Sequence, residues 1–211
     1  MTADTFAGPR RGADRAVLLA HGAGSDRQAP ALAAVADALA GVGVPSLRFD
    51  FPYRIAGRKA PDRPPVLAAA VEDAIRRLAS RTGLPRERLV LGGRSMGGRY
   101  CSMAAADGGA LGCALLGYPL HPPGKPDRLR VEHFGALTAP VLFAQGTRDS
   151  FGSPDELRAA AAAIPGRVTF HWVDSGDHGF RPLRSSGLDP DGVLVDVAAA
   201  VVAFVLGLPA P

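Results

Sequence analysis

One short stretch, residues 89–99 with the sequence LVLGGRSMGGR, constrains the fold more than any other part of the chain. An apolar run there ends in the pattern Gly93-x-Ser95-x-Gly97, and a helix-like segment follows over residues 99–106. Small residues around a serine let the backbone reverse sharply without a side-chain clash. A serine on such a strand-to-helix turn projects its hydroxyl above the edge of a sheet. The pattern therefore makes Ser95 the first candidate nucleophile.

Apolar runs alternate with helical patterns along the rest of the chain. The predicted strands are continuously apolar, which is typical of a parallel sheet that is covered on both faces. We therefore expect an α/β fold with a mostly parallel sheet of about six strands and helices on both faces. The predicted strands are residues 15–20, 44–51, 88–91, 111–116, 140–145 and 168–173. The predicted helices are residues 31–39, 66–80 and 99–106, one that starts at an N-cap serine at 153 and stops at 164–166, and 193–208.

The chain of 211 residues is expected to form a single domain over residues 15–208, preceded by a flexible segment over residues 1–14. That segment has no apolar core of signal-peptide length. The most apolar stretch, residues 193–208, is interrupted by Asp196 and is too short for a membrane span. Cys101 and Cys113 lack metal-ligand spacing and are expected to be small buried residues. These features predict a cytoplasmic protein without a membrane partner.

The net charge of +4 raises the question of nucleic-acid binding. The basic residues are scattered arginines, without a lysine or arginine block and without an aromatic stacking array, so we expect no nucleic-acid partner. Phosphate-binding loops are also excluded, because Gly92-Gly93 lacks the Walker lysine and no Gly-x-Gly-x-x-Gly opens a helix with an acidic partner. Zinc-ligand clusters are absent from the sequence. The sequence thus calls for no metal and no other cofactor.

Four groups come directly after predicted strands: residues 21–24 (HGAG), Ser95, Asp149 and His178. Sites in open parallel sheets form at the carboxyl ends of the strands, so we expect these groups to meet. His178 could take the proton of Ser95 and return it to a leaving group. Asp149 could hold the imidazole tautomer and stabilise the imidazolium.

Each of these residues also has a structural interpretation. Ser95 could be a turn former, and Asp149 could shape the loop before residue 153. Asp174 and Asp177 are rival acids, but Asp177 is adjacent to His178 and is badly placed to orient its ring. His178 is favoured because glycines bracket it in a loop after a strand. The other histidines, which lie in a strand, in the long loop or in the glycine turn, are His21, His121, His133 and His171.

Backbone N–H groups are expected to stabilise an oxyanion formed at Ser95. Met96 opens the following helix, which brings its N–H beside that oxyanion. The second donor should come from the loop after the first strand, where the N–H of Ala23 is the best candidate and Gly24 is the next. We expect His21 to pack or to hydrogen-bond within the same loop.

Five motifs together resemble the α/β-hydrolase superfamily. They are HGAG at 21–24, GGRSMGGR at 92–99, GYPLHPPGKP at 117–126, QGTRD at 145–149 and GDH-x-F at 176–180. The resemblance runs from about residue 15 to 205 and is closest to the small, cap-less dienelactone-hydrolase-like branch that includes the testis-expressed-type hydrolases. It implies an α/β-hydrolase fold without a cap domain and a Ser95–Asp149–His178 triad in that chain order. Dienelactone hydrolases carry a cysteine at the nucleophile position, whereas this chain carries serine.

The sequence therefore predicts a serine hydrolase of esterase or thioesterase type. It would form an acyl-Ser95 intermediate on a small or medium acyl substrate. The alternative is a non-catalytic binding or scaffold module on the same fold, a role that some larger relatives have. A serine peptidase fits less well, because 211 residues leave no propeller or cap domain to select peptides.

Two basic, proline-rich loops, residues 52–65 and 118–130, follow predicted strands and should lie on the rim that carries the triad. We expect an electropositive mouth that favours acyl substrates with a carboxylate or phosphate. Arg94, His121 and Arg148 are the candidate substrate-binding residues. The alternative is that Arg94 and Arg148 are held in structural ion pairs. The basic residues of the two loops are Arg54, Arg58, Lys59, Arg63, His121, Lys125, Arg128 and Arg130.

Overall fold

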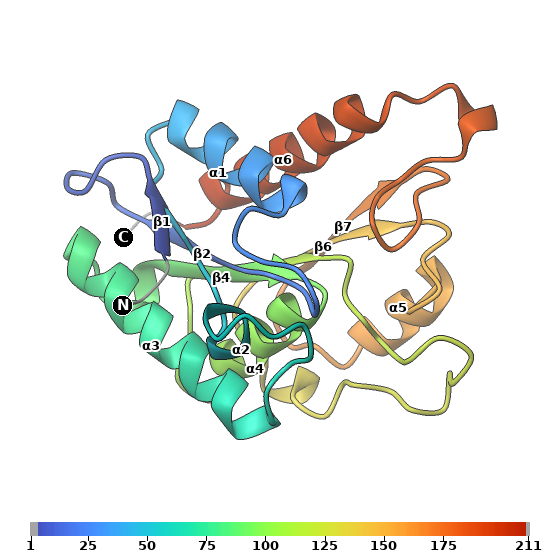
Figure 1. The fold of residues 1–211 in the computed structure, drawn as a ribbon, viewed down its shortest axis with the longest axis horizontal. Helices are drawn as coiled ribbons and strands as arrows, with labels where there is room; N and C mark the ends of the chain where they lie inside the picture. The colour runs from blue at the N-terminus through green and yellow to red at the C-terminus, as the bar shows by residue number, and fades with distance from the viewer. Residues whose placement is uncertain (1–3, 210–211) are drawn as a thin grey trace.

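The computed structural model describes residues 4–209, and its strands form one sheet (Figure 1). The sheet has seven strands in the order β1-β3-β2-β4-β5-β6-β7. All neighbouring strands are parallel except β1 and β3, which are antiparallel. The mostly parallel sheet is confirmed, with one strand more than expected. The strands are β1 (Asp4–Ala7), β2 (Ala16–Ala20), β3 (Ser46–Phe49), β4 (Leu89–Arg94), β5 (Gly112–Leu116), β6 (Val141–Gly146) and β7 (Val168–Val173).

Helices cover both faces of the sheet (Figure 1). Helices α1 and α6 pack on one face, and α3, α4 and α5 pack on the other. Alternate strand residues serve the two faces: Leu18 is buried against the α3 and α4 side, and Leu19 against the α1 and α6 side. The helices are α1 (Pro30–Gly41), α2 (Pro52–Ile55), α3 (Pro64–Thr82), α4 (Met96–Gly108), α5 (Pro154–Ala161) and α6 (Pro190–Leu206). Short 3₁₀ turns are η1 (Arg86–Arg88), η2 (Phe134–Ala136) and η3 (Arg184–Ser186).

The N-terminal stretch differs from the flexible segment expected over residues 1–14. Its residues 4–7 form β1, which pairs with β3 at the edge of the sheet. The Asp4 side chain is 2% exposed and accepts hydrogen bonds from Arg77 at 3.0 Å and Arg81 at 3.1 Å. Four residues are too few to show the alternation of apolar and polar residues that indicates a strand. The pairing with β3 and the ion pairs of Asp4 stabilise a strand that the sequence pattern did not predict. Residues 1–3 of the expected segment lie outside the described residues.

The first basic loop also contains more regular structure than expected. Its opening residues form the one-turn helix α2, and α3 begins at Pro64 rather than at residue 66. Both helices have proline in the first turn, where its fixed φ fits the helix and its missing N–H costs nothing. The expectation of a loop over residues 52–65 was therefore wrong at both ends and holds for the stretch between the two helices.

The most apolar helix, α6, packs against α1 and does not have the character of a membrane span. Within residues 4–209, none of the helices combines the length and the apolar character that crossing a bilayer requires. The predicted burial of the two cysteines is confirmed, because Cys101 on α4 and Cys113 on β5 are both fully buried. Burial raises the pKa of both thiols, that of Cys113 to about 12, so neither is a thiolate at neutral pH.

Candidate functional site

The backbone at Ser95 is held in a strained turn between β4 and α4. Its φ of 51° and ψ of −119° lie in a region that residues with a Cβ rarely adopt. The Ser95 N–H donates to the carbonyl of Leu116 at 2.9 Å, which ties the turn to β5. Gly93 and Gly97 pack on β2 so closely that a Cβ on either would lie 2.3 Å from the carbonyl oxygen of Ala20. The glycines of the motif are therefore required by close approach as well as by the turn.

Three side chains from three separate loops meet at the carboxyl edge of the sheet. The Nε2 atom of His178 lies 2.9 Å from Oγ of Ser95. Its Nδ1 atom lies 2.8 Å from Oδ2 of Asp149. The structure thus brings together the serine, histidine and aspartate that the sequence placed after β4, β7 and β6. This geometry can pass a proton from the hydroxyl to an imidazole whose other nitrogen is held by a carboxylate.

The carboxylate of Asp149 is fully enclosed, with no side-chain exposure. Besides His178, its Oδ2 accepts from Nε2 of Gln145 at 2.8 Å, and its Oδ1 accepts from the N–H of Phe151 at 2.8 Å. These bonds fix the carboxylate in the orientation that faces the imidazole. The rival Asp177 is used elsewhere, because its Oδ1 accepts from the N–H of Gly179 at 2.7 Å within its own turn.

Two supporting residues were not predicted from the sequence. Gln145 is buried at the end of β6, where its Oε1 accepts from the N–H of Tyr118 at 2.7 Å while its amide nitrogen holds Asp149. The ring of Phe151 stacks on that of His178, with centroids 4.1 Å apart. The signal for Gln145 was a polar residue closing an otherwise apolar buried strand, which implies a buried hydrogen-bonding partner.

The expected oxyanion donors, Met96 and Ala23, line the same cavity as Ser95 and His178. Met96 is the first residue of α4, and the N–H groups of a helix's first turn have no intrahelical acceptor. Its N–H is therefore available beside Ser95. Whether the N–H of Ala23 also points to this cavity depends on the peptide that precedes it.

His21 fixes the orientation of that peptide. Its Nδ1 lies 2.8 Å from the carbonyl oxygen of Gly22, and its Nε2 accepts from the N–H of Phe51 at 3.1 Å. Because Nε2 accepts, Nδ1 carries the proton and donates to Gly22; burial lowers the pKa of His21 and keeps the ring neutral. In a trans peptide the carbonyl and the next N–H point in opposite directions. Holding the Gly22 carbonyl inward therefore turns the N–H of Ala23 outward.

The cavity that contains Ser95 has a volume of about 470 Å³. Both apolar and charged residues line its walls. The apolar lining consists of Ala23, Pro61, Leu67, Met96, Tyr100, Pro119 and Phe151, and the charged lining consists of Asp62, Arg94, Arg99 and Arg130.

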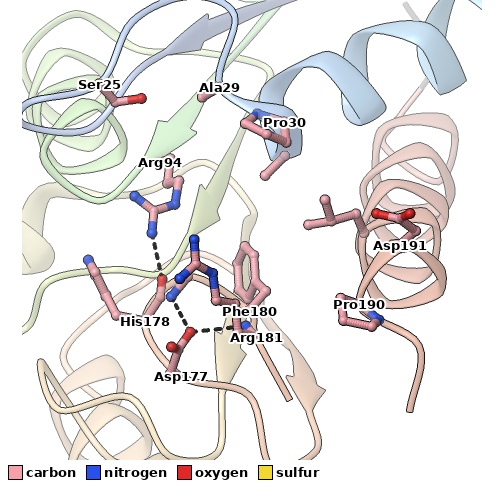
Figure 2. Close-up of a pocket in the computed structure, with 13 residues that line it drawn as sticks. Ser25, Ala29, Pro30, Arg94, Asp177, His178, Phe180, Arg181, Pro190 and Asp191 are labelled. Atoms are coloured by element: carbon pink, nitrogen blue, oxygen red, sulfur yellow. Dashed lines mark hydrogen bonds between the residues drawn. The ribbon is translucent and has the colours of Figure 1, made fainter. Parts of the chain in front are cut away.

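A larger cavity of about 590 Å³ lies toward α1 and α6 (Figure 2). It shares Arg94 and His178 with the first cavity but does not include Ser95. Figure 2 shows the guanidinium of Arg94 directed at the backbone of His178, and its Nη2 donates to that carbonyl at 2.9 Å. Among residues 4–209, no carboxylate oxygen lies within 4.0 Å of the Arg94 guanidinium. Arg94 therefore holds the loop of His178 through a backbone carbonyl. This contact is neither of the two that the sequence suggested for Arg94, a contact with the substrate or a structural ion pair.

The other two expected substrate-binding residues do not line the cavity of Ser95. His121 is 5% exposed, and its ring lies against the carbonyl of Pro122 at 2.9 Å and the carboxylate of Glu156 at 3.6 Å. Arg148 turns along the β7 loop and donates to the carbonyl of Ser175 at 3.4 Å. The expectation placed them on the correct edge of the sheet, but the packing of each loop directs their side chains elsewhere.

A second serine–histidine pair, Ser102 and His133, lies on the α4 side of the sheet. The Oγ atom of Ser102 is 2.7 Å from Nε2 of His133 and donates to the carbonyl of Arg99 at 2.8 Å. A hydroxyl has one proton, so donation to the carbonyl leaves the imidazole as the donor to Ser102 and not as its base. Ser102 is also fully buried within α4. The pair joins the start of η2, where His133 is the N-cap, to α4, and it offers no exposed nucleophile.

This pair should make stability depend on pH. Burial, together with the charge of Arg99, lowers the pKa of His133 from 6.5 to about 4. Between pH 6.5 and about pH 4, the imidazole is protonated in the unfolded chain but not in the folded chain. Folding stability therefore decreases as the pH falls through this window. After allowance for screening by water, we expect a loss of about 1 kcal/mol between pH 7 and pH 5. Urea unfolding at both pH values measures it, and His133→Gln should flatten the difference; an unchanged difference would contradict the assignment.

Comparison with solved structures supports the fold. The chain is similar to an alpha-beta serine hydrolase homologue from Coxiella burnetii, with 18% identity and a TM-score of 0.73 over 95% of this chain and 90% of that one. It is similar to a dienelactone hydrolase from Anabaena variabilis, with 21% identity and a TM-score of 0.73 over 97% and 91% of the two chains. It is also similar to Est1E from Butyrivibrio proteoclasticus, solved with ferulic acid, with 16% identity and a TM-score of 0.73 over 98% and 95%.

The profile described as alpha/beta hydrolase domain matches residues 13–206, which is nearly the whole chain. The matched range contains the glycine turn after β2, the Gly-x-Ser-x-Gly turn after β4, and the loops that carry Asp149 and His178. The resemblance found from the motifs is confirmed, and the chain belongs to the alpha/beta hydrolase domain family.

Proposed function

We propose that this protein is a serine hydrolase that cleaves ester or thioester bonds. The observation that carries the proposal is the continuous chain of hydrogen bonds from Ser95 through His178 to Asp149, at 2.9 and 2.8 Å. The strained turn supports it as well, because strain at a positive φ persists where the surrounding structure enforces it and is concentrated at functional sites.

The reaction begins with attack of Ser95 Oγ on the carbonyl carbon of the substrate. Nε2 of His178 takes the hydroxyl proton, and Asp149 stabilises the resulting imidazolium. The negative charge passes to the carbonyl oxygen, where the N–H groups of Met96 and Ala23 donate hydrogen bonds to it. When the tetrahedral intermediate collapses, the bond to the alkoxide or thiolate breaks, and the leaving group takes the proton from His178. The acyl group remains on Ser95.

Water completes the cycle. His178, now neutral, removes a proton from the water molecule, whose oxygen attacks the acyl carbon. Collapse of the second intermediate breaks the bond to Ser95 Oγ, which regains the proton from His178. A free acid leaves the cavity and the enzyme returns to its starting state.

The cavity supports a substrate of small or medium size. A volume of about 470 Å³ is at the lower end of the range typical of small-molecule sites. The lining of the cavity includes Met96, Tyr100 and Phe151, which offer contact area to a short acyl chain.

A fluorophosphonate probe tests the proposal directly. The probe reacts with a serine that an adjacent base activates, so we expect labelling of the native protein, with the modified peptide mapping to Ser95. The variant Ser95→Ala should lose the label, and the matched control Ser102→Ala should keep it. Labelling at Ser102, or no labelling of the folded native protein, would overturn the proposal and would favour the binding or scaffold alternative.

A further inference from the structure

Two arginines reach the cavity of Ser95 from different parts of the fold. Arg99 lies four residues after the serine, on the first turns of α4. Arg130 ends the second basic loop. Both line the cavity together with Ser95 and His178. The sequence-based list of basic residues on the rim included Arg130 but not Arg99, because Arg99 belongs to a helix.

Neither guanidinium is neutralised by a close, buried carboxylate. The nearest carboxylate to Arg99 is Glu132, whose Oε2 lies 4.0 Å from Nη2 and whose side chain is 72% exposed, so water screens it. The buried Nε of Arg99 has no hydrogen-bond partner among residues 4–209. Arg130 donates from Nη1 to the carbonyl of Pro119 at 3.2 Å, and in the same described part of the chain no carboxylate oxygen lies within 4.0 Å of it. Among residues 4–209, the carbonyl of Pro119 is thus the one acceptor of a side-chain hydrogen bond from either guanidinium.

The two positive charges also act on each other. Burial lowers the pKa of Arg130, and the charge of Arg99 lowers it further. Two like charges that face one partly buried cavity destabilise one another, and an anion placed between them relieves that cost. The arrangement therefore favours occupation by a negative group.

The other residues that line the cavity do not neutralise the charges of Arg99 and Arg130. Asp62 is the carboxylate among the residues that line it, and its Oδ1 already pairs with Arg58. Arg94 donates to the carbonyl of His178 and adds a further positive charge near the serine. The start of α4, directly after Ser95, contributes the positive end of a helix dipole.

The backbone that carries Arg130 is fixed on both sides. Its N–H donates to the carbonyl of Leu120 at 2.8 Å, and its carbonyl accepts from the buried hydroxyl of Tyr118 at 2.6 Å. Arg99 stands on a helix that packs on the central strands. Both guanidinium groups are thus presented from ordered elements, which lowers the entropic cost of binding an anion between them.

We propose that Arg99 and Arg130 form an anion-binding subsite, so that the substrate is an ester or thioester that carries a carboxylate or phosphate group beside the bond to be cleaved. The planar fork of each guanidinium matches the oxygens of either group. The substrate class rests on the proposed hydrolase function, whereas the subsite itself does not.

Kinetics with matched ester pairs test the substrate class. The first set compares the neutral ester 4-nitrophenyl butyrate with mono-(4-nitrophenyl) glutarate, which carries a carboxylate. The 4-nitrophenyl ester of 4-phosphonobutyrate, whose phosphonate stands in for a phosphate, is the third member of that set. A second pair puts the charge on the leaving group: the butyryl thioesters of propanethiol and of 3-mercaptopropionate. We expect the charged member of at least one pair to have the higher kcat/KM, with a preference that declines as salt rises. The arm with the larger preference identifies carboxylate or phosphate as the group recognised.

Variants assign that preference to the two arginines. Arg130→Gln and Arg99→Gln should each lower the ratio of kcat/KM for the charged ester over the neutral ester by roughly tenfold to a hundredfold, through KM. Arg130→Lys should recover part of the loss. Arg128→Gln is the matched control, because it removes the same charge from an exposed position in the same loop. Equal ratios for Arg130→Gln and Arg128→Gln would overturn the proposal.

Binding to an inactive protein separates this inference from the hydrolase proposal. Calorimetric titration of Ser95→Ala with glutarate and with inorganic phosphate needs no turnover. We expect at least one of these anions to bind, and to bind at least tenfold more weakly when Arg130→Gln is added. Binding without hydrolysis of any ester would keep the subsite and refute the enzyme. Hydrolysis without a charge preference, together with no binding of either anion, would refute the subsite and keep the enzyme.

Discussion

Replacing Ser95 by alanine is expected to lower kcat for ester hydrolysis by roughly 10⁴-fold or more while leaving the fold intact. The substitution removes the atom that attacks the substrate, and the N–H groups of Met96 and Ala23 can then stabilise only the slow attack of water. His178→Ala should reduce kcat by a similar factor, because it removes the base that lies 2.9 Å from the hydroxyl of Ser95. Steady-state kinetics with one good ester substrate measures both effects.

The double variant Ser95→Ala/His178→Ala distinguishes a joint mechanism from two separate contributions. Groups that act as one unit are strongly non-additive, so the double variant should be about as slow as either single variant. Ser102→Ala, the matched serine-to-alanine control, should retain near-native kcat, since its hydroxyl is buried and its partner His133 is not at the cavity. Multiplicative effects of the two single substitutions would indicate that Ser95 and His178 act independently, which the proposed mechanism does not allow.

The arrangement of these groups was predictable because it depends on topology. Ser95, Asp149 and His178 each come directly after an apolar run that could be assigned as a strand. Parallel strands of one sheet end at the same edge, so the position of each residue relative to its strand was sufficient to expect their meeting. The fold class, the mostly parallel sheet and the buried cysteines follow from the same kind of local pattern.

Side-chain direction within loops was not predictable in this way. His121 and Arg148 follow strands and lie next to functional motifs, yet the packing of their loops turns them toward Glu156 and Ser175. Arg99 lies in a helix, where its pattern gave no reason to expect a cavity. The strand β1 was missed because four residues carry no detectable period. Each of these depends on tertiary contacts that the local sequence does not encode.

Replacing Asp149 by asparagine is the second change expected to have a large effect, with kcat reduced by about 10³–10⁴-fold. Asp149 accepts three N–H groups: Oδ1 accepts from Phe151, and Oδ2 accepts from Gln145 and faces Nδ1 of His178. An amide has only one acceptor oxygen. If that oxygen remains with Phe151, the amide NH₂ faces two donors, Gln145 and His178. The imidazole must then present an unprotonated Nδ1, which leaves Nε2 protonated and unable to act as a base.

A second substitution, at Gln145, should separate the effect of Asp149→Asn on stability from its effect on activity. Asp149→Asn should cost about 1–3 kcal/mol of unfolding free energy, because a buried NH₂ faces the NH₂ of Gln145 without an acceptor. Adding Gln145→Glu supplies that acceptor and still accepts the N–H of Tyr118, but its new oxygen also faces the carbonyl of Tyr118, to which Gln145 donates at 3.2 Å, so stability should recover in part. Activity should not recover, because the amide of residue 149 still donates to His178 and keeps the wrong tautomer. Urea unfolding and kcat of both variants measure this; recovery of kcat along with stability would mean that Asp149 acts only by supporting the fold and does not set the proton on His178.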